Sequence, residues 1–342
     1  MPIFKSAIFL AAAFLLTSCL PAGVRSDKKG RSPHRFKTEV MLSYTPVKNQ
    51  GRSPLCWAYS MLATIETEHI MMGDSVNLSV DYVARKLLAE QARCHFLSSG
   101  YDRVTLRGTM PLLLRLIGEY GAMPYDSYNN KTINYNALAK QVALMSDASV
   151  DMSQLAGRVE RLFDERIGAL PNNVYMLGAE YTPCEFAHSV CMRGEYTALT
   201  SFTHHPFGEQ FVLEVPDNYS DELFYNVPVD VMMKRIERSL RNGHPVCWEG
   251  DITERGFSFE KGVAELEDDR PCSQKQRQKA FETRRTTDDH CMVLIGIAHD
   301  SRGKRFFIAK NSWGTGNPYG GLMFLSENYV RLKTIAVMVK NL

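Results

Sequence analysis

The strongest constraint on this chain is one cysteine segment that is complemented by two segments far downstream. Cys56 lies in the segment Ser-Pro-Leu-Cys56-Trp57, whereas the pair Asp289-His290 and the segment Asn311-Ser-Trp-Gly stand near the other end. A thiol, an imidazole and an amide so far apart in sequence act together only when one folded domain brings them together. The chain is therefore expected to form a domain in which these groups meet.

Cys56 is predicted to begin an α-helix. Pro54 stands just before it, where proline suits the start of a helix. Apolar residues then recur at the spacing of one helix face, namely Ala58, Met61, Leu62 and Ile65. A thiol attacks a carbonyl group well only as the thiolate, and the positive end of a helix dipole favours that form. The position therefore suits Cys56 as a nucleophile.

His290 and Asn311 are predicted at the ends of two buried strands. His290 opens an apolar run that reads as a strand over residues 290–298, and Asn311 follows a second run over residues 305–310. His290 is the candidate base or ion-pair partner of the thiol, and the Asn311 amide is placed to orient the imidazole. Trp313 is expected to shield that contact from water.

Gln50 lies six residues before the cysteine. Its side-chain amide and the Cys56 backbone N–H are candidate donors to the oxyanion that forms when a thiolate attacks a carbonyl group. One such donor contributes roughly 3 kcal/mol in serine proteases. Gln50 is therefore predicted as a fourth catalytic residue.

At these residues the chain resembles the papain-like cysteine peptidases, and it is most similar to their bleomycin hydrolase and aminopeptidase C branch. The similarity is sharpest over residues 46–66, 108–128 and 288–321. The long stretch between Cys56 and His290 is typical of the branch, as are residues 201–207, 215–218 and 286–290. The short interval between Cys19 and Cys56 leaves no room for the inhibitory propeptide of papain zymogens.

The resemblance implies an α+β fold with two lobes, one helical and one strand-rich and β-barrel-like, with the active-site cleft between them. It places Cys56 on one wall and His290 on the other, and it implies a branch-specific insertion roughly within residues 129–285. The implied activity is hydrolysis of peptide bonds through a thioester on Cys56, with peptides as substrates and with no cofactor or metal ion. Because branch members often form hexameric rings, a homo-oligomer is left open.

The resemblance also implies which residues line the substrate site, and here the chain departs from the family. Pro54 and Arg107 stand where relatives have glycine, so a rigid ring and a positive charge are expected beside the substrate. The other residues expected at the substrate are Trp57, Gly108, Asp289 and Trp313.

Three activities are compatible with this pattern. Aminopeptidase action is typical of the branch, but the chain stops at Leu342 without the C-terminal arm that restricts branch members to chain ends. Endopeptidase action is the alternative. The third is a catalytically inactive, peptide-binding surface lipoprotein, which would have no chemical need for the four catalytic groups Cys56, His290, Asn311 and Gln50.

The N-terminal segment is typical of an exported bacterial lipoprotein. A basic residue precedes an apolar run too short to span a bilayer comfortably, and Leu16-Thr-Ser-Cys19 resembles the site at which cleavage leaves an acylated cysteine. We predict a signal peptide over residues 1–18, a membrane anchor on acylated Cys19, and a flexible basic tether over residues 19–40. Leu20 gives no sign of an inner-membrane retention signal, so the outer membrane of the cell envelope is expected if the source is Gram-negative, with the domain on the periplasmic or the surface face. An ordinary signal peptide is the alternative.

Composition limits the remaining functions. The balance of 40 basic and 38 acidic residues argues against a nucleic-acid partner. His204 and His205 are expected to be loop or surface histidines and not a metal pair, because adjacent strand residues point to opposite faces. Residues 265–285 are expected to be solvated. Six further cysteines are compatible with disulfides, although Cys184 and Cys191 also fit two unrelated thiols: Cys94, Cys184, Cys191, Cys247, Cys272 and Cys291.

Helical and strand patterns are segregated along the chain. Helices are predicted over residues 56–70, 79–90, 110–120, 135–145, 152–167 and 228–242. Strands are predicted over residues 210–214, 245–249, 290–298, 305–310 and 334–339. This segregation predicts an α+β domain over residues 41–342.

Overall fold

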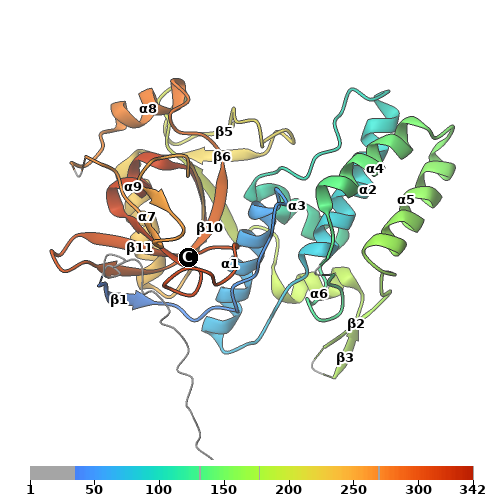
Figure 1. Ribbon diagram of the computed structural model, residues 1–342, viewed down its shortest axis with the longest axis horizontal. Helices are drawn as coiled ribbons and strands as arrows, with labels where there is room; N and C mark the ends of the chain where they lie inside the picture. The colour runs from blue at the N-terminus through green and yellow to red at the C-terminus, as the bar shows by residue number, and fades with distance from the viewer. Residues whose placement is uncertain (1–34, 131, 177, 269, 342) are drawn as a thin grey trace, which may run out of the picture. The chain divides into compact units, whose positions relative to one another are not determined.

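The computed structural model describes residues 35–341 except residues 131, 177 and 269. The predicted signal peptide and Cys19 lie outside the described residues. The helices α2 to α6 gather on one side of α1, whereas most strands lie on the other side together with α7, α8 and α9, which confirms the predicted α+β fold with two lobes (Figure 1). The helices are α1 (Cys56–Met72), α2 (Val80–Leu97), α3 (Met110–Tyr120), α4 (Tyr135–Asp147), α5 (Met152–Arg166), α6 (Pro183–Val190), α7 (Val229–Arg241), α8 (Gln274–Glu282) and α9 (Glu327–Lys333).

The strand-rich lobe is built on one sheet with the order β5-β6-β4-β13-β7-β10-β11-β12-β9-β8, and β1 pairs with β10 beside this path. A separate hairpin joins β2 and β3. The strands are β1 (Lys37–Met41), β2 (Val174–Met176), β3 (Ala179–Tyr181), β4 (Tyr196–Thr200), β5 (Gln210–Val212), β6 (Leu223–Asn226), β7 (Val246–Gly250), β8 (Phe257–Ser258), β9 (Val263–Ala264), β10 (His290–His299), β11 (Arg305–Lys310), β12 (Leu322–Ser326) and β13 (Thr334–Lys340).

Helix α1 lies between the two lobes. It begins at Cys56, as predicted, and ends at Met72, and the following Gly73 caps its last carbonyl groups with a left-handed backbone (φ 95°). The predicted apolar stripe of α1 is buried, but so are polar residues on its other faces, because the sheet covers one side and the helices the other. Cys56 therefore starts a rigid, buried element.

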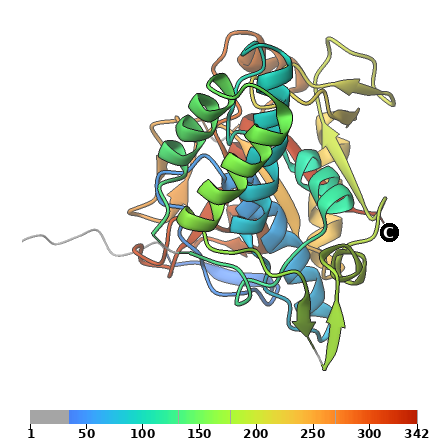
Figure 2. The same ribbon diagram turned by 90° about the vertical axis from the view of Figure 1, so that its right-hand side faces the viewer.

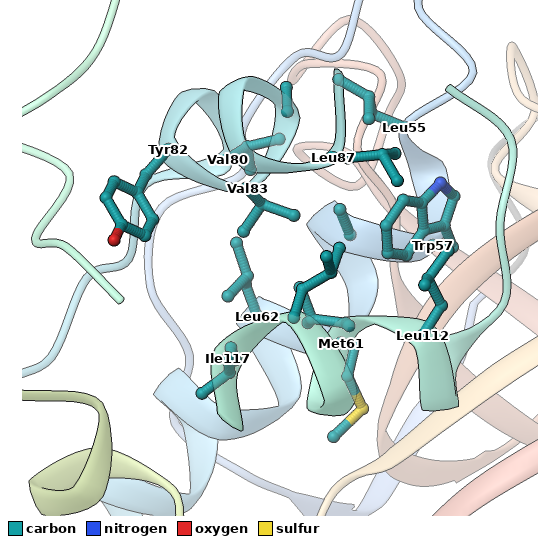
Figure 3. Packing of buried hydrophobic residues seen from close by; sticks show 14 of the residues in the cluster. Leu55, Trp57, Met61, Leu62, Val80, Tyr82, Val83, Leu87, Leu112 and Ile117 are labelled. Atoms are coloured by element: carbon teal, nitrogen blue, oxygen red, sulfur yellow. The ribbon is translucent and has the colours of Figure 1, made fainter. Parts of the chain in front are cut away.

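The helical lobe packs around the side of α1 that faces away from the sheet. Figure 3 shows side chains of α1, α2 and α3 meeting in this core, with Trp57 beside Leu112 and Leu62 near Val83. Seen after a quarter turn, α4 and α5 lie side by side in front of this core (Figure 2).

Strand β10 is the centre of the sheet around the site. Its N-terminal half pairs with β7, in the register His290↔Gly250 and Cys291↔Glu249, and its other edge pairs with β11. Gly296 is required in this strand, because a Cβ atom there would lie 2.3 Å from the Val40 carbonyl oxygen. His290 is thus fixed at the start of a strand that has neighbours on both edges.

The structure corrects the predicted end of the tether. Lys37–Met41 form β1, which pairs with the half of β10 that β7 leaves unpaired, for example at Thr38↔Ala298. The Leu42 N–H continues this contact by donating to the Ile295 carbonyl group at 2.8 Å. The folded part therefore starts before residue 41, because backbone hydrogen bonds hold residues that look like a basic linker in sequence.

The other predicted elements are found within a few residues of their positions, except that α2 extends seven residues beyond its predicted end at residue 90, and several short elements were not predicted. The strand β12 is a short apolar run, which does not distinguish a strand from a helix without its neighbours. The charged segment is also not simply solvated, since Arg277 of α8 is fully buried and donates to the Ser201 carbonyl oxygen at 2.9 Å.

The described cysteines form no disulfide. All seven are free thiols: Cys56, Cys94, Cys184, Cys191, Cys247, Cys272 and Cys291. The structure therefore agrees with the alternative that Cys184 and Cys191 are two unrelated thiols. Among the residues that the structure places, no helix is long and apolar enough to cross a bilayer.

Candidate active site

Cys56 lies at the N-terminus of α1, where two neighbours favour its ionised form. The Cys291 thiol donates a hydrogen bond to its sulfur, and the His290 imidazole adds a hydrogen bond and a favourable charge. These contacts hold the pKa of Cys56 well below its usual range, against the opposing effect of burial. Burial raises the pKa of Cys291 well above its usual range, so Cys291 stays protonated as the donor. The site thus favours a Cys56 thiolate.

His290 is held from its far side by Asn311. Asn311 Oδ1 lies 2.8 Å from His290 Nε2, so Nε2 carries a proton and donates it to the amide oxygen. This leaves Nδ1 for the hydrogen bond with Cys56. The Trp313 ring covers the imidazole, with 4.6 Å between the ring centroids. The geometry matches the predicted roles of Asn311 and Trp313.

Gln50 is fixed against the segment that follows Asn311. Its backbone N–H donates to the Ser312 carbonyl group at 2.8 Å, and its Oε1 accepts from the Ser312 hydroxyl group. One N–H of its amide donates to the Ser53 carbonyl group at 2.8 Å. The Gln50 amide has a second N–H, and the first N–H groups of α1 have no partner within the helix. These donors suit the predicted oxyanion site.

The predicted substrate residues separate into buried and accessible ones. Trp57 is only 1 % exposed and donates to the Leu106 carbonyl group at 2.9 Å, so the prediction that it binds substrate is wrong. Its indole instead packs in the helical core (Figure 3) and against Gly108, where a Cβ atom would lie 2.9 Å from its ring. Gly108 is also buried, and its role is close packing.

The accessible residues are Pro54, Arg107, Asp289 and Trp313. Arg107 does not present a free charge, because its guanidinium group pairs with Asp217 at 2.8 Å. The Asp289 carboxylate accepts from the Thr287 hydroxyl group at 2.9 Å. Pro54 is half-buried, two residues before the catalytic thiol.

Sequence reasoning missed Cys291 and three acidic residues near it. Cys291 follows the catalytic histidine directly, and its role depends on the fold, which turns its thiol toward Cys56. Glu249 interrupts the apolar strand β7, and that charge in a buried strand was the available signal. Asp217 and Asp288 meet only in the fold, where the Asp217 N–H donates to Asp288 Oδ2 at 2.9 Å.

A group that could hold a metal ion lies outside this site. His204, His205 and Glu214 present ligand atoms within 4.8 Å of one another. The two histidines lie in a turn and not in a strand, which corrects the argument that they point apart. However, Gln278 donates to His204 Nδ1 at 3.1 Å, so Nε2 carries the proton and donates to Glu214. The cluster therefore fits a hydrogen-bonded group better than a metal centre.

A cavity of about 950 Å³ lies beside Gln50. It is lined by residues 46–53 and by the asparagine-rich segment that precedes α4, with Asp81 and Tyr135 among the lining residues. Gln50 and Ser53 belong to its wall, so the space adjoins the predicted oxyanion donors. It is large enough for part of a peptide.

The fold and the Cys–His–Asn site together define a papain-like cysteine peptidase. The model of the Peptidase C1-like family matches residues 171–341, which is half of the chain and includes His290 and Asn311. The chain belongs to the Peptidase C1-like family.

Solved structures and curated proteins agree with this placement. The crystal structure of PepW from Lactobacillus rhamnosis HN001 superimposes with a TM-score of 0.71 at 17 % identity, over 89 % of this chain and 82 % of PepW. At that identity the likeness shows the fold alone. Ananain from Ananas comosus is 45 % identical over 40 residues, and this match spans only 12 % of this chain and 12 % of ananain.

Proposed function

We propose that the protein hydrolyses peptide bonds through a thioester on Cys56. The observation that carries this proposal is the position of His290, which bonds the Cys56 sulfur on one side and Asn311 on the other. A thiolate paired with an imidazolium is a nucleophile and an acid in one unit. An apolar pair of similar volume would stabilise the fold as well as this ion pair does, so stability alone does not explain the arrangement.

The chemistry follows from these contacts. The Cys56 thiolate attacks the peptide carbonyl carbon, and the oxyanion is stabilised by the Gln50 amide and the Cys56 backbone N–H. The C–N bond then breaks, and His290 gives its proton to the leaving amine. Neutral His290 next takes a proton from water, the hydroxide attacks the thioester, and the carboxylic acid leaves as the thiolate forms again. Asn311 keeps the imidazole in the required tautomer throughout.

Within this activity we favour oligopeptide aminopeptidase action over endopeptidase action, on the resemblance to the aminopeptidase C branch. The experiment compares an N-terminally free and an N-terminally blocked peptide, with the full-length protein in reductant and Cys56→Ala as the control. Cleavage of the free peptide alone supports an aminopeptidase, and cleavage of both supports an endopeptidase. No Cys56-dependent cleavage of either peptide refutes peptidase activity and favours a peptide-binding lipoprotein.

We further propose that the protein is an exported bacterial lipoprotein, anchored in the outer membrane through acylated Cys19. The support is the sequence Leu16-Thr-Ser-Cys19 after a short apolar run. Two or three acyl chains give stable membrane binding, whereas a single chain gives only marginal binding. Labelling of producing cells with a radioactive fatty acid should mark the wild-type protein and not Cys19→Ala. Equal labelling of both would refute the anchor.

A further inference from the structure

Two cysteine side chains meet at the start of α1, one from the helix and one from β10. Val293 of β10 lines a small cavity together with Ser60 and Ala63 of α1, so this face of the strand lies against the helix. Cys291 stands two residues before Val293, and alternate residues of a strand share one face. Cys56 stands one helical turn before Ser60 and packs against the buried cluster that contains Cys291. The fold therefore brings the two thiols together, and they are hydrogen bonded.

The two thiols differ in exposure and in charge. Cys56 is partly exposed, whereas Cys291 is only 2 % exposed. Cys56 also lies at the positive end of a helix dipole and favours the thiolate, which is the form that oxidants attack. An oxidant from solution therefore reacts at Cys56, and burial protects Cys291 from direct attack.

Oxidation of Cys56 changes the reactivity of Cys291. Burial raises the pKa of the Cys291 thiol most, and its hydrogen bond to Cys56 and the charges of Glu249 and Cys56 raise it further. A sulfenic acid on Cys56 carries no charge, so the contributions of the Cys56 thiolate disappear when it is oxidised. Cys291 then gives up its proton more readily, next to a sulfur that a second thiol can attack.

We propose that Cys291 is the resolving cysteine of a reversible oxidation site, in which a peroxide joins Cys56 and Cys291 in a disulfide. The Cys56 thiolate attacks one oxygen of hydrogen peroxide, the O–O bond breaks, and the departing hydroxide takes the proton of the His290 imidazolium. Cys56 is then a sulfenic acid, oxidised by two electrons. The Cys291 sulfur attacks the Cys56 sulfur, the S–O bond breaks, and the hydroxyl group leaves as water with the Cys291 proton.

The disulfide protects the nucleophile. A sulfenic acid without a partner thiol is oxidised further to sulfinic acid, which is irreversible for most proteins. A disulfide is reopened by exchange with a reducing thiol, and both cysteines are restored. Cys56 thus survives exposure to peroxide without permanent loss of its thiol, whether or not the protein cleaves peptides.

Mass spectrometry measures the disulfide directly. The fully reduced, full-length protein is treated with hydrogen peroxide, its free thiols are blocked with iodoacetamide, and it is digested with trypsin without reductant. The tryptic peptides over residues 53–85 and 286–302 contain one cysteine each, Cys56 and Cys291. We expect these two peptides to be joined in protein that stays monomeric on a nonreducing gel, and to separate after dithiothreitol. A Cys56 peptide that is joined to another cysteine, or that carries only sulfinic acid, would overturn the inference.

The substitution Cys291→Ser removes the resolving thiol and keeps an O–H donor for Cys56. After peroxide, dithiothreitol should restore iodoacetamide labelling of nearly all Cys56 in the wild-type protein but of little Cys56 in the variant. Dimedone added with the peroxide should trap the sulfenic acid of Cys56 in the variant and much less of it in the wild-type protein.

Cys94→Ser is the matched control, because it removes an exposed thiol and should behave as the wild-type protein does. Equal restoration of Cys56 in Cys291→Ser and in the wild-type protein would overturn the inference. If Cys291→Ser does not fold, the joined peptides of the wild-type protein still decide. No readout uses a peptide substrate, so a failure of the proposed peptidase activity leaves each of these outcomes unchanged.

Discussion

Glu66, a buried glutamate of α1, should hold the segment before α1 and the strand β11 together. Glu66 is fully buried and accepts hydrogen bonds from Thr45, from the Lys48 ammonium group at 2.7 Å and from the Leu78 N–H at 2.7 Å. The buried Lys310 donates to the Thr45 hydroxyl group at 2.7 Å, and burial lowers its pKa to about 8 although the charge of Glu66 raises it. The charge of one carboxylate is thus set against two lysines, Lys48 from the segment before α1 and Lys310 from β11.

The substitution Glu66→Gln keeps the shape of the side chain and removes its charge. It turns an NH2 group either toward the Thr45 hydroxyl group or toward the Leu78 N–H and the Lys48 ammonium group, so at least one donor loses its acceptor. Removal of one partner of a buried ion pair costs about 3–5 kcal/mol. Since 1 kcal/mol moves the unfolding midpoint of a domain of about 150–250 residues by about 2–4 °C, we expect Tm to fall by about 6 °C or more.

Thermal unfolding followed by circular dichroism measures this effect, with the exposed Glu267→Gln as the matched control. Because Lys310 immediately precedes Asn311, the kcat of Glu66→Gln should also fall, as the amide that orients His290 loses its support. A Tm within about 2 °C of the wild-type value would refute the reasoning, since it would mean that the lysines do not need the charge of Glu66.

Three further substitutions test the site. Cys291→Ala removes the hydrogen bond that lowers the pKa of Cys56, so the midpoint of iodoacetamide alkylation against pH should move upward; an unchanged midpoint contradicts the assigned donor. Asn311→Ala frees the His290 ring and should lower kcat about 100-fold with little change in Tm, and equal kcat would contradict the orienting role. Gly108→Ala places a methyl group 2.7–2.9 Å from core side chains and should destabilise the protein by about 1–3 kcal/mol in urea unfolding, whereas full stability would contradict the packing.

The sequence predicted the elements with long periodic patterns. The helix that starts at Cys56 and the helix over residues 110–120 begin where predicted, because an apolar stripe and a preceding turn define them. Strand β1 was not predicted, because its alternation is weak and its partner β10 lies far along the chain. Pairing between distant segments depends on tertiary structure that local patterns do not carry.

The candidate catalytic groups could be named from the sequence for a different reason. Cys56, His290 and Asn311 have side chains whose chemistry is specific in combination, so their sequence context was enough to predict that they meet, and the structure brings them together. Trp57 was misjudged because an aromatic residue beside a nucleophile fits a substrate wall and a core equally well, and only its 1 % exposure decides. Glu249 was not predicted as a site residue, because its position near the thiols depends on Cys291, which lies opposite it on the neighbouring strand β10.

The two fully buried glutamates near the site should respond with opposite signs. Glu66 receives three donors, whereas no donor reaches Glu249 Oε2 within the described residues. A satisfied buried carboxylate stabilises the fold, but an unsatisfied one destabilises it and is retained for function. Glu249→Gln should therefore leave Tm unchanged or raise it in the same assay in which Glu66→Gln lowers it. A fall of several degrees for Glu249→Gln would contradict this reasoning, since it would mean that the carboxylate has a structural partner.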